Sequence, residues 1–381
     1  MSLRRLGAAG GLIVLALVST GCFLIQAGPN PGNNQNYLLG VSCPVPGSCT
    51  AVGDYVNSDG TGGSLIETGG VDGVTWSVVP SPNNGTPVGV SCLSTKFCMA
   101  VGSGGVSTST TFAESWDGTT WSVVPSPSPG TQRNVLRAVS CVSTAMCTAV
   151  GGDWNGTPSP PPFTLVESWN GTTWSVVPSP NPSAHSNDLS GVSCVSASFC
   201  VAVGATQGAS TNLSFTLVEM WDGTTWSVVP SPDPSTASSP FNTLSSVSCV
   251  STTSCTAVGS YLTNTTSNTL IESWDGTTWS VVPSPNASGS DGLLSVSCVS
   301  TTSCTAVGDF NNAVPRLQTL VETLNGSTWS VVPSPNSSSS DINYLNGVSC
   351  PPGGTCTAVG SSDTGNGAPV HILITHDVPI S

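Results

Sequence analysis

Hydrophobic and polar positions along the chain follow one unit that recurs almost from end to end. The unit reads V-S-C-V-S-T-T-S-C-T-A-V-G, continues through a variable stretch, and then reads T-L-V-E-S-W-D-G-T-T-W-S-V-V-P-S-P-N. Its short runs of β-branched and aromatic residues, separated by Gly, Asp, Asn and Pro, are typical of strands joined by tight turns. The fifth copy of the unit predicts four strands, at residues 244–249, 255–258, 269–274 and 278–282.

The spacing of the repeats predicts the architecture. Each copy holds a C-x5-C pair, and the first cysteines of successive pairs lie 49, 49, 53, 55, 49 and 52 residues apart. A period near 50 residues with four strands per period is typical of propeller blades. Repeats begin near residues 37, 86, 135, 188, 243, 292 and 344. We therefore expect residues 22–381 to form an all-β, seven-bladed β-propeller with four antiparallel strands in each blade.

The seventh repeat lacks a fourth strand, and the N-terminal part of the chain offers one. Residues 23–30 (FLIQAGPN) align with the W-S-V-V-P-S-P-N of the other repeats. Phe23 precedes Cys43 by 20 residues, which is the distance from Trp121 to Cys141. We expect this segment to complete the last blade, because a shared blade closes the ring and removes its open edges.

Fourteen of the fifteen cysteines belong to the repeated pairs. Two residues six apart across a hairpin turn can lie at a separation that a disulfide accepts. A zinc site needs four ligands, and the chain has three histidines, His185, His371 and His376. A redox-active site would favour C-x-x-C with a nearby base. We expect seven structural disulfides, Cys43–Cys49, Cys92–Cys98, Cys141–Cys147, Cys194–Cys200, Cys249–Cys255, Cys298–Cys304 and Cys350–Cys356.

The unit, V-S-C-V-S-T-T-S-C-T-A-V-G followed by E-S-W-D-G-T-T-W, resembles the repeats of BNR/Asp-box propellers. It is especially similar to the repeats of the photosystem II assembly-factor type. Their turn motif, roughly S/T-x-D-x-G-x-T-W, is approximated with one residue missing by Ser273, Asp275, Gly276, Thr278 and Trp279. The resemblance covers about residues 37–377 and implies a fold, because many functions share these short motifs.

Residues 1–21 are typical of an export signal. Arg4 and Arg5 precede a short apolar run at residues 12–18, which is too short to span a bilayer. The segment ends in Ser19-Thr20-Gly21-Cys22, which resembles the lipobox of bacterial lipoproteins. The resemblance implies a lipid on Cys22, the one cysteine outside the pairs, and attachment to the outer surface of the cell membrane. The alternative is a plain secretory signal with an incidental cysteine.

The charge of the chain excludes some partners. The formal net charge is −14, and beyond the signal the cations are Lys96, Arg133, Arg137 and Arg316. Nucleic acid and anionic lipid headgroups are bound through clustered Lys and Arg, so we expect neither as a partner. The membrane would then be contacted through the N-terminal lipid alone. Sialidase-like chemistry would also need a cluster of arginines for the substrate carboxylate.

The loops that join the second strand to the third, and the fourth strand to the next blade, vary in length and sequence. A rigid scaffold with one variable face is the usual layout of a binding site. Trp154 lies in such a loop beside Asp153 and Asn155, and this combination suits stacking on a sugar ring. The alternative is a loop-stabilising role. The other ten tryptophans occupy repeat positions and predict packing between blades.

A glutamate recurs on the third strand of six repeats, at Glu67, Glu114, Glu167, Glu219, Glu272 and Glu322. An active site is unique within a ring, so this repetition predicts a structural role. Buried charge must find partners, and with so few cations we expect backbone N–H or Ser/Thr hydroxyl donors, with a bound cation as the alternative.

The leading functional hypothesis is a non-enzymatic, monomeric module that binds protein or glycan through its variable loops and uses no cofactor or metal. One alternative is a glycan-active enzyme with Asp153 or Asp188 among its acids. Another is an envelope assembly scaffold, which the repeat resemblance implies.

Overall fold

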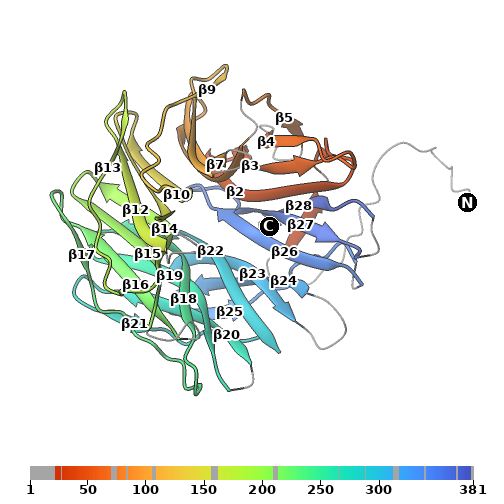
Figure 1. Cartoon of the computed structure of the whole chain (residues 1–381). Helices are drawn as coiled ribbons and strands as arrows, with labels where there is room; N and C mark the ends of the chain where they lie inside the picture. Colours follow the sequence, from red (N-terminus) through yellow and green to blue (C-terminus); the bar gives the residue numbers. More distant parts are fainter. Residues whose placement is uncertain are drawn as a thin grey trace, which may run out of the picture.

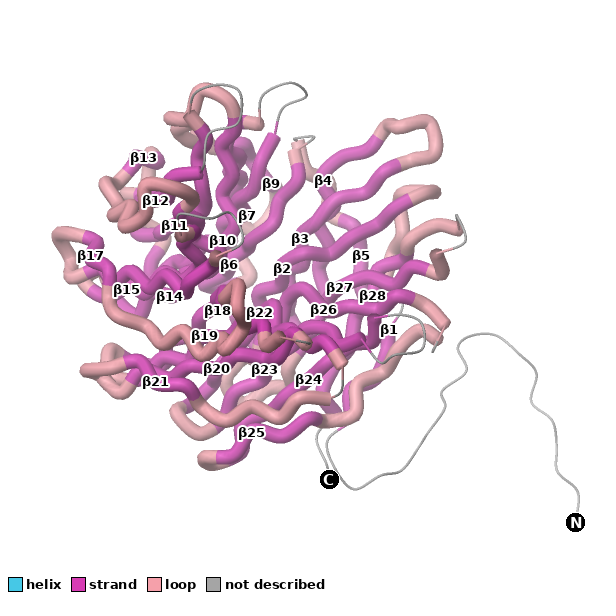
Figure 2. The backbone as a smooth tube through the Cα atoms, turned by 60° about the horizontal axis from the view of Figure 1, so that its bottom comes forward, coloured by secondary structure: helices cyan, strands magenta, loops and turns pink. Residues whose placement is uncertain are grey.

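The computed structural model describes residues 22–378, apart from 27, 70–74, 83–84, 105–108, 156–161, 209–212, 265, 288, 312–316, 339 and 366–367. The chain forms seven four-stranded sheets, each of them antiparallel, and Figure 1 shows them arranged around a central axis. Figure 2 shows strands and loops throughout the described chain. The expected seven-bladed propeller is confirmed.

The first strand of each repeat is innermost and lines the axis (Figure 1). These strands are β2 (Gln35–Val45), β6 (Thr86–Ser94), β10 (Arg133–Ser143), β14 (Asn187–Ser196), β18 (Asn242–Ser251), β22 (Ser290–Ser300) and β26 (Ile342–Ser349). The second strands are β3 (Ser48–Val56), β7 (Phe97–Gly104), β11 (Met146–Trp154), β15 (Phe199–Gln207), β19 (Ser254–Leu262), β23 (Ser303–Asn311) and β27 (Thr357–Asp363).

The third strands are β4 (Gly62–Gly69), β8 (Thr110–Trp116), β12 (Pro162–Trp169), β16 (Ser214–Trp221), β20 (Ser267–Trp274), β24 (Leu317–Asn325) and β28 (His371–Val378). The outermost strands are short: β5 (Trp76–Val78), β9 (Trp121–Val123), β13 (Trp174–Val176), β17 (Trp226–Val228), β21 (Trp279–Val281) and β25 (Thr328–Val331). Proline follows each of them within two residues and cannot donate to a ladder, which ends the strand.

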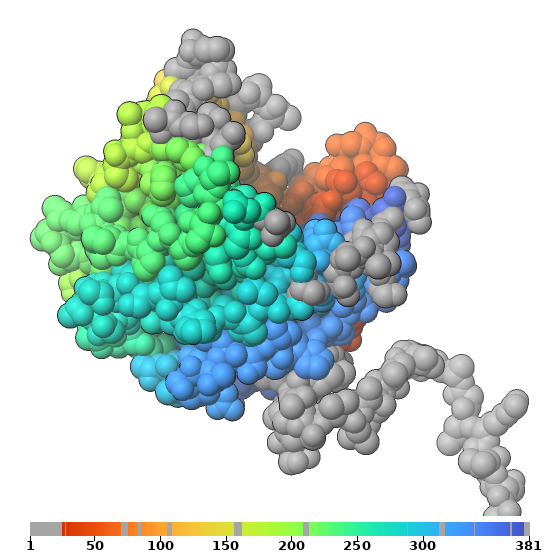
Figure 3. Space-filling model, turned by 90° about the horizontal axis from the view of Figure 1, so that it is seen from below, coloured from red at the N-terminus to blue at the C-terminus, as the bar shows by residue number. Residues whose placement is uncertain are grey.

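The last blade takes its outermost strand from the N-terminal side of the chain. Strand β1 (Cys22–Gln26) pairs antiparallel with β28, and Ile25 lies opposite Thr375. In Figure 3 the orange surface of the first blade lies beside the blue surface of the last. The predicted closure of the ring is therefore confirmed.

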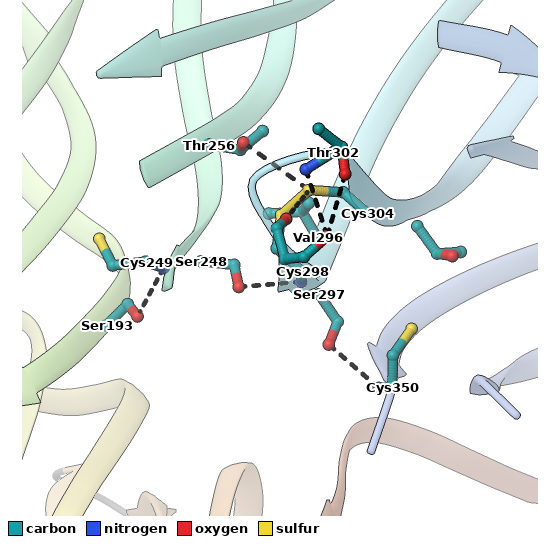
Figure 4. The surroundings of a disulfide bond; sticks show 12 residues. Ser193, Ser248, Cys249, Thr256, Val296, Ser297, Cys298, Thr302, Cys304 and Cys350 are labelled. Atoms are coloured by element: carbon teal, nitrogen blue, oxygen red, sulfur yellow. Dashed lines mark hydrogen bonds between the residues drawn. A yellow bond between two sulfur atoms is a disulfide. The ribbon is translucent and has the colours of Figure 1, made fainter. Parts of the chain in front are cut away.

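All seven expected disulfides are present, and each lies in the hairpin turn between the first and second strands. The serine of V-S-C links each blade to the next, because its hydroxyl accepts a hydrogen bond from the N–H of the next blade's first cysteine. Figure 4 shows Ser248 accepting from Cys298 (3.0 Å) and Ser297 accepting from Cys350 (3.0 Å). The series includes Ser349 of the last blade and Cys43 of the first (2.9 Å), so the links form a closed circle.

The backbone at two positions explains why glycine recurs there in the repeated unit. The innermost strand has a bulge, and the glycine of A-V-G lies close to it: a Cβ on Gly151 would meet the Val135 carbonyl oxygen at 2.0 Å. Gly276, in the turn between the third and fourth strands, has φ +99°, which other residues rarely adopt. In that turn Asp275 Oδ1 accepts from the N–H groups of Thr277 and Thr278, at 2.8 and 2.9 Å.

The core lies between the blades. Ala149 and Val150 of β11 are fully buried, and one apolar cluster joins Met99 and Val101 of the second blade to Leu165 and Trp169 of the third. The paired tryptophans on facing strands pack with ring centroids 5.7 to 5.8 Å apart in four blades. Packing, as expected, is the role of these repeated tryptophans.

Candidate functional site

The variable loops gather on one face of the ring, which we call the loop face: it is formed by the loops from second to third strands and from fourth strands to the next blade. A repeated asparagine holds these loops. Asn134, at the start of β10, accepts from the Gly130 N–H (2.6 Å) and donates to the Gly130 carbonyl (2.9 Å). Equivalent residues accept from the preceding loop at Asn36, Asn187, Asn242, Asp291 and Asn343. The sequence interpretation missed this position, although asparagine stands seven positions before the first cysteine in five of the seven repeats and aspartate in a sixth.

A central cavity of about 310 Å³ runs along the axis. Every innermost strand contributes the residue at its bulge, and the side chains at this position are Leu39, Val88, Arg137, Ser190, Ser245, Leu294 and Asn346. Arg137 is the charged member of this set. The cavity is therefore lined mainly by small and uncharged groups, with one guanidinium on the side of the third blade.

Arg137 is paired across a blade boundary. Its Nη2 lies 2.6 Å from Asp188 Oδ2, and its Nε lies 3.3 Å from Asp188 Oδ1. The two side chains are 31% and 24% exposed. A bidentate arginine–carboxylate pair fixes both partners in geometry, so Asp188 is engaged rather than free to act as an acid or base.

The residues predicted to bind ligand lie where β11 ends, at the loop face. The guanidinium carbon of Arg133 lies 4.9 Å from the centroid of the Trp154 ring, and Trp154 is half-buried while Arg133 is exposed. This stacking is a cation–π contact. Sequence reasoning had named Arg133 as a cation but had not joined it to Trp154.

Asp153 and Asn155 are joined by a hydrogen bond, but Asp153 is buried rather than exposed. Its side chain is 8% exposed, and burial raises its pKa. Asn155 donates from Nδ2 to Asp153 Oδ1 (3.3 Å) and accepts from the Thr131 N–H (3.0 Å). Successive strand residues point to opposite faces, so Trp154 and the buried Asp153 do not share one surface. Asp153 thus supports the loop.

An acidic group with two tyrosines lies in the sixth, seventh and first blades. Burial raises the pKa of Tyr37, and the nearby Tyr344, Asp363 and Asp54 raise it further. Burial likewise raises the pKa of Tyr344, with Asp363 and Asp309 adding to the effect. Burial and the nearby Asp291 raise the pKa of Asp309 to about 6. Asp54, Asp309 and Asp363 lie at the loop-face ends of the second strands β3, β23 and β27, and Asp291 lies at the start of the innermost strand β22.

The repeated glutamates are structural, as expected, and a serine hydroxyl is the donor to five of the six. All six are fully buried. The Ser231 hydroxyl of one Pro-Ser-Pro segment donates to Glu272 Oε2 of the next blade at 2.6 Å, and Ser126 does so to Glu167 at 2.7 Å. The same contact joins Ser81 to Glu114, Ser179 to Glu219, and Ser284 to Glu322.

Within the described residues, no group of three or more His, Cys, Asp or Glu side chains is placed to hold a metal ion. The same residues contain no helix long and apolar enough to cross a membrane. The export segment 1–21 and Arg316 lie outside the described residues. Cys22 begins β1, at the edge of the last blade.

Comparison with known proteins shows the architecture. No family model and no curated protein matches the chain. The solved structure of YCF48 bound to D1 peptide is 11% identical, with a TM-score of 0.56, over 95% of this chain and 97% of that one. The structure of U3-55K is 9% identical, with a TM-score of 0.59, over 94% of this chain and 98% of that one. At such identities the likeness shows the propeller fold alone.

Proposed function

We propose that this chain is an exported, lipid-anchored module whose propeller binds a segment of another protein at the loop face and catalyses no reaction. The observation that carries the proposal is the contrast between the two faces. The face with the disulfide turns repeats similar residues in blade after blade, whereas the loop face carries Arg133 and Trp154, which no other repeat has at the same place. Binding sites are commonly built from such variable loops on a rigid scaffold.

The surroundings of the two candidate acids, Asp153 and Asp188, favour binding over catalysis. Asp153 is buried and accepts a hydrogen bond from Asn155, and Asp188 is held by Arg137. A glycosidase needs a pair of carboxyl groups that flank the scissile bond, one as acid and one as base or nucleophile. A protein ligand is further supported by the propeller of similar fold that was solved with a bound peptide. A glycan stacked on Trp154 is the alternative ligand, since the indole stays half-exposed.

The proposed anchor also orients the ring. Strand β1 starts at Cys22 and occupies the position of a fourth strand, and fourth strands begin at the face that bears the disulfide turns. A lipid on Cys22 would hold that face toward the membrane and present the loop face outward. Incorporation of an alkyne fatty acid into the wild-type chain, and its loss with release of the protein in Cys22→Ala, would support the anchor; release of the wild-type chain would contradict it.

Site-specific crosslinking tests the binding proposal. A photo-crosslinking amino acid is placed at Thr131 on the loop face and, as the matched control, at Thr119 in a turn on the disulfide face; both residues are exposed. We expect a discrete protein adduct from Thr131 in intact cells and none from Thr119. An adduct from Thr119 alone, or one that digests with glycosidases rather than proteases, would refute protein binding at the loop face.

A further inference from the structure

The loop face differs in charge from one side of the ring to the other. Asp54, Asp309 and Asp363 lie on the side of the first, sixth and seventh blades, and Asp59 and Asp341 lie in the adjoining loops. We call this set the acidic side. No Lys or Arg belongs to the described residues of those three blades. Its carboxylates are close enough to Tyr37 and Tyr344 to raise the pKa of both phenols.

The third blade carries an exposed positive charge. Arg133 is exposed and its guanidinium lies over the Trp154 ring, while the charge of Arg137 is matched by Asp188 at 2.6 Å. Asp153, the remaining carboxylate there, is buried and bonded to Asn155. Arg133 is therefore the exposed charge on this side, and the indole beneath it fixes its position. We call Arg133 and Trp154 the basic side.

The two sides lie across the cavity from one another. The inner strands contact in the order β2, β6, β10, β14, β18, β22, β26 and back to β2, so the blades follow the chain around the ring (Figure 1). In a ring of seven, the third blade lies opposite the boundary between the sixth and seventh. Between the two sides, the cavity wall is formed by uncharged residues such as Ser190 and Ser245 in one direction around the ring and Val88 in the other.

We infer that the loop face binds an extended protein segment that lies across the ring and whose charges are segregated, with basic residues over the acidic side and an acidic residue over Arg133 and Trp154. This inference rests on the proposed function. A segment of this kind places each of its charges near an opposite one, and interleaved or uniform charge patterns do not. Complementary potentials select partners by penalising like charges in contact.

Synthetic peptides of equal length on a Gly-Ser backbone test the inference with the full-length mature protein. One peptide carries acidic residues at one end and basic residues at the other, a second has the same composition with the charges interleaved, and the third and fourth are uniformly basic and uniformly acidic. We expect the segregated peptide to bind tightest by fluorescence anisotropy, with an affinity that falls as salt rises, because Arg133 is exposed and the carboxylates of the acidic side are at most partly buried.

Substitutions in the protein then test which side of the loop face binds each end of the segregated peptide. Arg133→Glu is expected to weaken the segregated peptide about fivefold, which is the scale of one exposed ion pair, and to favour the uniformly basic peptide. Asp363→Asn is expected to weaken the segregated peptide as well. Lys96→Glu, a change of equal charge in a turn on the disulfide face, serves as the control and is expected to leave binding unchanged. Circular dichroism of each variant confirms that it folds.

The outcomes separate this inference from the proposed function. Equal binding of segregated and uniformly basic peptides, with no response to Arg133→Glu, overturns the inference. Failure of every peptide, together with a protein adduct from Thr131 in cells, overturns the inference and leaves loop-face protein binding in place. Absence of both peptide binding and the adduct overturns the two proposals together.

Discussion

Five of the seven boundaries between blades share a serine–glutamate hydrogen bond that the two boundaries of the last blade lack. At the five, a serine of Pro-Ser-Pro donates to a buried glutamate of the next blade, as Ser231 does to Glu272 at 2.6 Å. Between the sixth and seventh blades, Thr375 occupies the glutamate position and its buried hydroxyl has no partner among the described residues. Between the seventh and first, Gly28 stands at the serine position, and both oxygens of Glu67 lack a described partner.

The difference follows from how the last blade is assembled. Its outer strand β1 and its inner three strands come from separate parts of the chain, and neither part keeps the repeated Ser and Glu. A Cβ on Gly28 would meet Ile372 Cδ1 at 2.2 Å, so isoleucine side chains fill the place where a serine would lie. The last blade therefore relies on apolar packing and on the inner circle of serine–cysteine links, which continues through Ser349 and Cys43.

The largest expected effect is a fall in the free energy of unfolding as pH rises from about 5 to about 8. Burial raises the pKa of Glu67 and Glu167 to about 8, and that of Glu219, Glu272 and Glu322 to about 7. Between the ordinary pKa near 4.5 and these values, the folded protein binds more protons than the unfolded chain, so stability declines with pH.

Burial lowers the pKa of His376, which opposes this trend, but one imidazole acts against five carboxyl groups. Denaturant titrations across this pH range provide the measurement. A stability that stays level or increases with pH would contradict the buried, proton-holding glutamates.

Removing a disulfide is expected to have the next largest effect, and the same effect in either kind of blade. Cys298→Ala with Cys304→Ala should cost about 2 kcal/mol, the loop-entropy value for so short a closed loop. Cys350→Ala with Cys356→Ala, in the last blade, should cost the same, because both pairs lie in equivalent hairpins. Thermal unfolding compares the two. A clearly greater loss in the last blade would mean that its disulfide compensates for the missing serine–glutamate contacts.

Ser231→Ala is expected to lower the free energy of unfolding by about 1–2 kcal/mol above pH 8, where it leaves a buried carboxylate without its donor. The loss should shrink toward pH 5, because the hydroxyl favours the ionised form of Glu272 and lowers its pKa. Ser227→Ala, at an exposed position on the outer strand of the same blade, is the control. An equal loss at both pH values would show that the hydroxyl does not act through the carboxylate.

The smallest expected effect is a gain. Glu67→Met should raise the free energy of unfolding by about 1 kcal/mol at pH 8, because it removes a buried carboxyl that has no described donor and fills the same space. Glu272→Met, which leaves the Ser231 hydroxyl without its acceptor, should bring no such gain. Chemical denaturation of the two variants makes the comparison. A loss of stability in Glu67→Met would indicate that Glu67 is satisfied in solution.

Local pattern was enough to predict the number of blades, the disulfides and the closing strand. The C-x5-C spacing fixes cysteines that face each other across one hairpin, and the fit of residues 23–30 to the fourth-strand pattern identified β1. Predicted and observed strands differ mainly in length: in the fifth blade the first strand spans Asn242–Ser251 rather than 244–249, and the fourth spans Trp279–Val281 rather than 278–282. The inner strand extends because pairing with β19 continues past the bulge.

Contacts between blades were decided by tertiary structure alone. Ser231 and Glu272 are 41 residues apart, and Arg137 and Asp188 are 51 apart, so neither pair is visible as a short motif. The burial of Asp153 and the stacking of Arg133 on Trp154 also arise only when β10 pairs with β11 and the neighbouring blades pack on both sides. A repeat pattern specifies what each blade does within itself, whereas closure of the ring sets which side chains of different blades meet.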